Sequence, residues 1–158
     1  SGQGARVGVL ALRDTNRDGR ADRTEEFGRS GGTGIALAPG YVYVDEGPRV
    51  VRYPVPAGGL APNGEAEAIV TGLPMGGHAA HNILLDGRGA LYVNVGSLTN
   101  SCQREDRQTR SPGVDPCAEL ETRAGVWRYA ADRLGQQFSA RERYATGIRN
   151  AMGLAVDL

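Results

Sequence analysis

Two histidines are the side chains of this 158-residue chain best suited to accept a proton near neutral pH. They are His78 and His81, in the stretch MGGHAAHNILL at residues 75–85. His78 follows a Gly-Gly pair, and His81 stands at the start of an apolar run. Two interpretations are open: a general base on a solvent-accessible cleft, or a histidine that merely lies in a surface loop.

A second stretch of the same kind carries a guanidinium and an amide. ATGIRNAMGL, at residues 145–154, places Arg149 and Asn150 before an apolar run, much as the two histidines precede theirs. If both links lie at one rim, a base would stand beside an arginine that can pair with an anion. That combination suits a site for a polar, negatively charged ligand.

An acidic stretch near the start of the chain could bind a hard cation. DTNRDGRADRTE, at residues 14–25, matches the calcium-loop pattern D-x-[DN]-x-[DN]-G-x5-E at every defined position. Helices usually flank such a loop, whereas here it joins two predicted strands, so the alternative is a polar hairpin connection that binds nothing. A bound ion would be structural, because nothing nearby in the sequence looks reactive. Its oxygen ligands would come from Asp14, Asn16, Asp18 and Glu25, with Asp22 contributing directly or through water.

An internal repeat predicts the elements that position these stretches. Short runs rich in Val, Ile, Leu and Tyr alternate with Gly, Pro and Asp turns, and no stretch shows a convincing 3.6-residue period. A first apolar strand is predicted three times, at residues 32–40, 81–89 and 151–158. Second strands follow at 41–44 and 91–95, third strands at 50–55 and 125–132, and fourth strands at 67–72 and 142–147. Residues 8–14 and 24–28 occupy the third and fourth slots of an earlier unit.

Four antiparallel strands, repeated at roughly 50 residues plus insertions, are typical of a β-propeller blade. The predicted fold is therefore all-β, with a β-sandwich of coincidentally similar strands as the alternative. The chain would hold the end of one blade, two nearly full blades and the first strand of another. Because propellers close at about 4–8 blades, residues 1–158 are expected to be a partial β-propeller domain, truncated at both ends, or a chain that assembles with other copies.

Composition argues against two classes of partner. Basic and acidic residues balance at 18 each, and every one of the basic residues is Arg. No basic block indicates nucleic-acid binding. No run is long enough to span a membrane, and no signal peptide opens the chain.

The two cysteines, Cys102 and Cys117, lack the spacing of a metal or haem site. The residues between them are polar and marked by Pro and Gly, as in a long surface loop. A disulfide across the base of this loop would stabilise the fold by about 3 kcal/mol on the loop-closure model. It would also favour an exported protein. The alternative is two unrelated free thiols.

Several of these motifs together resemble the glucose/sorbosone dehydrogenase family. They are GGHAAHNILLDGRGALYVNVGS, GVWRY and ERYATGIRNAMGLAVD, which span most of the chain. Members of that family are soluble, exported sugar dehydrogenases that depend on pyrroloquinoline quinone (PQQ) and form a six-bladed propeller. The insertion SCQREDRQTRSPGVDPC and the hairpin DTNRDGRAD also look like those of the sorbosone-type branch.

The resemblance implies a role for each candidate residue. His78 would be the general base that removes the hydroxyl proton of a sugar while hydride passes to PQQ. Arg149 and Asn150 would contact the cofactor. His81, at the edge of the same cleft, is expected to be a further cofactor contact, in place of an Arg or Lys that many relatives have at this position. Glucose-type members carry an acid that orients the catalytic histidine where this chain has Ser97.

The resemblance also implies the surroundings of the reaction. The substrate would be a sugar, an external acceptor would take the electrons, and the protein would be periplasmic or secreted. The family's further PQQ contacts and its cofactor-site calcium ligands lie on later blades. These 158 residues alone are therefore expected to hold PQQ weakly and to be inactive.

Two functions of other classes remain open. One is a non-catalytic secreted propeller that binds a glycan or a protein. The other is a propeller hydrolase of the lactonase kind, which needs carboxylate and Asn metal ligands clustered in the central channel. The clear acidic cluster of this sequence, at residues 14–25, lies on a predicted hairpin loop, which argues against the hydrolase.

Overall fold

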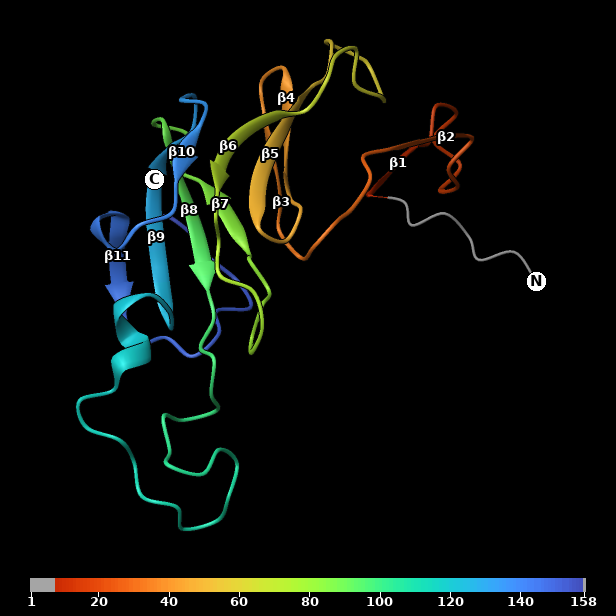
Figure 1. Cartoon of the computed structure of the whole chain (residues 1–158). Coiled ribbons are helices and arrows are strands. Elements are labelled where there is room, and N and C mark those ends of the chain that lie inside the picture. The colour runs from red at the N-terminus through yellow and green to blue at the C-terminus, as the bar shows by residue number, and fades with distance from the viewer. Residues whose placement is uncertain (1–7, 158) are drawn as a thin grey trace.

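The structure is a computed structural model that describes residues 8–157 (Figure 1). None of the helical turns in this part of the chain is long and apolar enough to cross a membrane. The strands are β1 (Val9–Arg13), β2 (Arg23–Phe27), β3 (Ile35–Ala38), β4 (Tyr41–Asp45), β5 (Arg49–Pro54), β6 (Glu67–Thr71), β7 (Ile83–Leu85), β8 (Ala90–Val95), β9 (Gly125–Ala130), β10 (Gln136–Gln137) and β11 (Arg143–Thr146). Two short 3-10 turns are η1 (Ala118–Glu121) and η2 (Ala140–Glu142).

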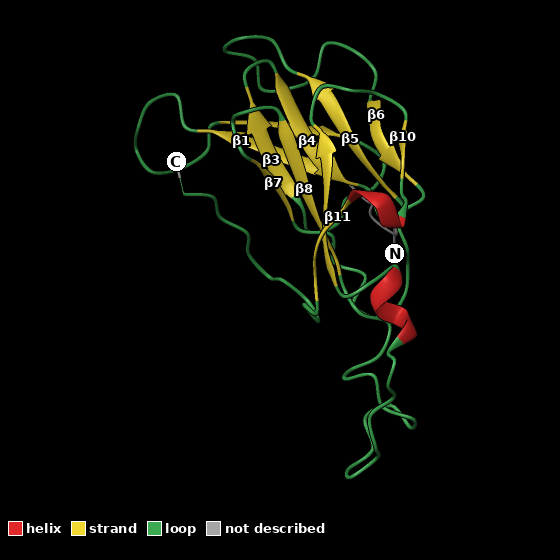
Figure 2. Cartoon of the chain, turned by 90° about the vertical axis from the view of Figure 1, so that its left-hand side faces the viewer, coloured by secondary structure: helices red, strands yellow, loops and turns green. Residues whose placement is uncertain are grey.

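Two four-stranded antiparallel meanders form the body of the chain. The first runs β3-β4-β5-β6 and the second β7-β8-β9-β11, each with its strands paired in chain order. The hairpin β1–β2 precedes them as a separate two-stranded sheet. Ten of these strands coincide with predicted runs, because short runs bounded by Gly, Pro and Asp turns mark them. Figure 2 shows the sheets in a second view, with the helical turns at one side.

One predicted strand is not formed, and one short strand was not predicted. Residues 151–157 are without regular structure, although they were expected to begin a further blade. A first strand needs the second strand of its own blade as a hydrogen-bonding partner, and the described chain has no later strand to supply one. The unpredicted strand is β10, which pairs in parallel with β6 and ties the two meanders together.

Alternating side chains build two apolar layers. In β4, Tyr41 and Tyr43 pack toward the second meander, whereas Val42 and Val44 pack toward the β1–β2 hairpin. The layer between the two meanders is the larger one and holds the most deeply buried side chains, Trp127, Ile69, Leu91, Val50, Val70, Val93 and Val95. Sheets packed face to face in this way are the arrangement of neighbouring propeller blades.

Apolar side chains remain exposed on both flanks of the pair of sheets. Ile35 and Leu37, on β3, are 57% and 76% exposed. On the other flank, Tyr92 and Tyr144 contact each other edge-on and line an apolar hollow of about 230 Å³. A partial propeller would cover such faces with its remaining blades. That residues 1–158 form such a partial domain stays a prediction.

Candidate functional site

His78 lies in the link between β6 and β7, against the residues that follow β8. Its backbone N–H donates to the carbonyl oxygen of Ser97 at 2.9 Å. Two glycines make this approach possible. A Cβ on Gly96 would lie 2.1 Å from the His78 carbonyl oxygen, and one on Gly77, whose φ is 61°, would lie 2.5 Å from the Ser97 carbonyl oxygen. The motifs GGH and VGS can therefore pack this closely only because Gly77 and Gly96 have no side chain.

The ring of His78 is oriented by Ser97, which is buried. His78 Nδ1 lies 3.1 Å from the Ser97 carbonyl oxygen and 3.1 Å from Ser97 Oγ. Ser97 Oγ donates its own hydrogen to the Thr99 carbonyl oxygen at 2.6 Å, so it faces His78 as an acceptor. With two acceptors before it, Nδ1 carries the ring hydrogen, and Nε2 keeps a lone pair. A neutral imidazole in this tautomer can take a proton at Nε2.

Arg149 contacts the same segment at its two ends, Ser97 and Asn100. Its carbonyl oxygen accepts from the Ser97 backbone N–H at 2.8 Å. Its Nε donates to the Asn100 carbonyl and side-chain oxygens at 3.0 and 3.1 Å, while the side chain stays exposed. The structure thus brings His78 and Arg149, predicted from distant stretches, to one segment, Ser97–Asn100.

Asn94 is a supporting residue that the sequence reasoning missed. It is fully buried, and its amide ties the two predicted links together. Its Nδ2 donates to the Ala80 carbonyl at 2.9 Å, and its Oδ1 accepts from the Ala151 backbone N–H at 3.0 Å. Asn150 contacts the same amide through Oδ1 at 3.3 Å. A lone amide in the apolar run LYVNV is the signal that could have identified it.

The structure corrects the expectation that His81 faces the cleft and binds the cofactor. The side chain is fully buried, with Nδ1 3.4 Å from Asp45 Oδ1 and Nε2 3.2 Å from the Pro74 carbonyl oxygen. The chain before β7 packs tightly on the chain before β3, where a Cβ on Gly34 would lie 2.2 Å from the His81 carbonyl oxygen. This contact turns position 81 inward, so His81 is an internal tie between the two meanders.

Loss of this tie should affect stability. We predict that His81→Leu lowers the free energy of unfolding by about 1–3 kcal/mol, because the Pro74 carbonyl loses its imidazole partner and the buried Asp45 carboxylate loses the polar ring beside it. Urea titration of the variant measures it, with the half-buried His78→Leu as the matched control. An unchanged midpoint for His81→Leu would contradict the internal role.

The acidic hairpin loop satisfies several of its oxygens internally. Asp14 accepts from the backbone N–H of Gly19 at 2.8 Å. Asp22 accepts from the hydroxyl and the backbone N–H of Thr15, and the hydroxyl hydrogen bond holds the pKa of Asp22 below its usual value. Glu25 belongs to β2. Within residues 8–157, no three carboxylates of this loop lie within 4.8 Å of one another. Calcium binding here stays a prediction.

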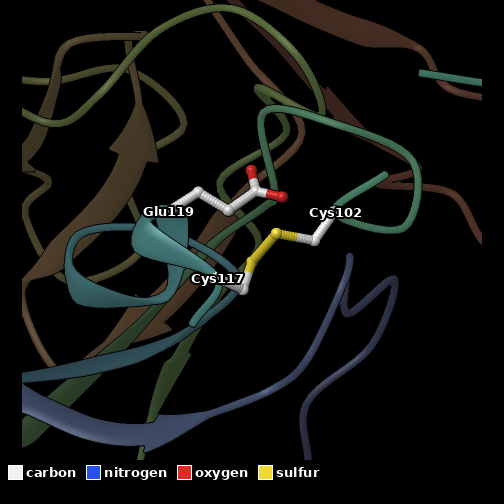
Figure 3. A group of neighbouring side chains, drawn as sticks. All are labelled: Cys102, Cys117 and Glu119. Atoms are coloured by element: carbon white, nitrogen blue, oxygen red, sulfur yellow. A yellow bond between two sulfur atoms is a disulfide. The ribbon is translucent and has the colours of Figure 1, made fainter. Parts of the chain in front are cut away.

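The disulfide between Cys102 and Cys117 is formed, as one of the two alternatives predicted. Glu119 lies beside it (Figure 3). This group does not have the chemistry of a metal centre, because the sulfurs are bonded to each other and offer no thiolate. The Glu119 carboxylate also accepts the backbone N–H groups of Leu98 at 2.6 Å and Thr99 at 3.1 Å.

Comparison with known proteins places the fold. No protein-family model and no curated protein sequence matches the chain. Among solved structures it is similar to the calcium structure of the family AA12 carbohydrate-active enzyme of Trichoderma reesei, with a TM-score of 0.65 and 19% identity over 92% of this chain and 37% of that one. It is also similar to the holo form of the pyranose dehydrogenase PQQ domain from Coprinopsis cinerea, with a TM-score of 0.65 and 21% identity over 92% of this chain and 35% of that one.

These likenesses support the predicted all-β propeller fold. The chain spans little more than a third of the length of the two structures, 37% and 35%. At identities of 19% and 21% the likeness concerns the fold alone, because one fold can carry many functions.

Proposed function

We propose that this chain is part of a PQQ-dependent sugar dehydrogenase of the sorbosone type, in which His78 is the general base. One observation carries the proposal: Ser97 holds the ring hydrogen of His78 on Nδ1 and leaves Nε2 free, while Arg149 contacts the same segment. The similarity to a PQQ domain supports the choice of cofactor. The disulfide supports an exported protein, secreted or periplasmic.

The residues present fit an anionic quinone. PQQ carries three carboxylates and an ortho-quinone, and the exposed Arg149 guanidinium offers planar N–H donors that suit such oxygens. Asn150 is proposed as a second contact. When bound, PQQ supplies the quinone carbon that accepts hydride.

Two side chains of this chain then take part in the reaction: His78 accepts a proton, and Arg149 stabilises a negative charge. Nε2 of His78 accepts the proton of the sugar hydroxyl as the C–H bond gives up its hydride, so the alcohol becomes a carbonyl. Arg149 stabilises the negative charge that develops beside it. An external acceptor removes the electrons afterwards. The neutral Ser97 orients His78 without the added basicity that an adjacent carboxylate would give.

The test is reconstitution of the intact protein that contains this chain. With PQQ and calcium added, we expect aldoses to bleach an electron-acceptor dye, and the same protein without PQQ to leave the dye unchanged. Failure of the intact protein to bind PQQ would exclude the dehydrogenase. Binding of a glycan or a protein at the His78 surface without PQQ would favour the non-catalytic propeller.

A further inference from the structure

The segment Ser97–Asn100 carries both proposed functional groups. Ser97 holds the imidazole of His78, and Asn100 holds the guanidinium of Arg149. The geometry of the site therefore depends on what fixes the residues between them, Leu98 and Thr99.

Glu119 fixes those two residues. One carboxylate oxygen accepts the backbone N–H groups of Leu98 and Thr99, and the other accepts the Thr99 hydroxyl. The Thr99 hydroxyl oxygen in turn accepts the Cys102 backbone N–H at 2.9 Å. Three donors converging on one carboxylate hold a loop segment that would otherwise be free to turn.

The disulfide brings Glu119 to this position. Cys117 is the residue before η1, and Glu119 lies in the first turn of η1. Its partner Cys102 lies three residues after Thr99, so the S–S bond closes the base of the long insertion beside the segment that Glu119 holds (Figure 3). The turn η1, which directly follows the insertion, thus brings an acidic side chain to the site.

The link from Glu119 to His78 passes through the Thr99 carbonyl. While Thr99 is held, its carbonyl takes the Ser97 hydroxyl hydrogen, and Ser97 Oγ faces Nδ1 as an acceptor. If Thr99 turns away, the Ser97 hydroxyl is free to donate to Nδ1 instead. Nδ1 would then face one donor, the hydroxyl, beside one acceptor, the Ser97 carbonyl oxygen. The Nε2–H tautomer would become populated beside the Nδ1–H form, and the ring in that second form cannot take a proton at Nε2.

We propose that Glu119 is a positioning residue that keeps His78 in its Nδ1–H tautomer and Arg149 on Asn100, and that it does so from η1, directly after the disulfide-closed insertion. The catalytic consequence rests on the proposed function, whereas the tautomer does not. Ser97, the residue that contacts the His78 ring, carries no charge. The carboxylate of Glu119 acts on that ring indirectly, through Thr99 and Ser97.

The test reads the tautomer by nitrogen-15 NMR of the histidine-labelled intact protein at about pH 8, where a histidine is ordinarily neutral. The His78 signal is assigned by its loss in His78→Gln. We expect the Nδ1–H form in the unmodified protein and a mixture of both tautomers in Glu119→Ala. Glu119→Gln should retain the native tautomer, since one amide oxygen can still accept the two backbone N–H groups. The matched control is Glu121→Ala, an exposed acid on the same turn.

A pure Nδ1–H tautomer in folded Glu119→Ala would overturn the proposal. If that variant does not fold, Thr99→Val removes one of the three donors, and a smaller shift toward the Nε2–H form is expected; an unshifted tautomer there would overturn it equally. In the reconstituted protein kcat should fall roughly tenfold in Glu119→Ala with KM little changed. A tautomer shift in a protein that oxidises no sugar would refute the proposed function and leave the positioning role intact.

Discussion

Replacement of His78 by glutamine is expected to lower kcat for sugar oxidation by about 10²- to 10⁴-fold in the intact, PQQ-loaded protein. An amide in this place can still donate toward Ser97 but cannot accept the hydroxyl proton. The side chain is half-buried and lies in a link between strands, so the melting temperature should change little. Stopped-flow dye reduction under substrate saturation measures the effect.

Binding of PQQ distinguishes a base from a cofactor ligand. His78→Gln should bind PQQ as the unmodified protein does, whereas Arg149→Ala should bind it more weakly, because it removes the proposed anion partner. Exogenous imidazole should restore part of the activity to His78→Ala. A His78→Gln variant that keeps more than a tenth of the activity would show that another group takes the proton.

The repeat made most of this fold predictable from the sequence. Strands such as β4 and β8 show both signals that matter, a short apolar run and Gly turns at each end. The links that carry His78 and Arg149 both reach the segment Ser97–Asn100, as expected if equivalent links of adjacent blades lie at one rim. The roles of the two side chains stay predictions. A sequence repeat predicts strands well when each strand pairs with the next one along the chain, as in both meanders.

The direction of single side chains was not predictable in this way. His81 points inward because the chain before β3 packs against it, and this depends on Gly34 and Asp45, far away in the sequence. The role of Ser97 depends likewise on Thr99 and on Glu119, which the disulfide loop returns to the site. Such contacts are set by tertiary packing and leave no local pattern.

The layer between the two meanders gives the largest expected effect on stability. Trp127, on β9, is fully buried there, packs on Phe138 with ring centroids 5.2 Å apart, and donates Nε1–H to the Ser139 carbonyl at 3.0 Å. We expect Trp127→Ala to lower the free energy of unfolding by about 3–5 kcal/mol, since it leaves a cavity between two sheets and an unpaired carbonyl. Urea unfolding of the intact protein, followed by circular dichroism, measures this loss.

Trp127→Phe separates packing from hydrogen bonding at this position. It keeps an aromatic ring against Phe138 but removes the donor to Ser139, so we expect a loss nearer 1 kcal/mol than 4. Because β9 pairs with both β8 and β11, loosening it should also move the links that carry Ser97 and Arg149. Trp127→Ala should therefore lose PQQ-dependent activity at lower urea than Trp127→Phe. Equal stability of the two variants would place the core of the chain elsewhere than between these sheets.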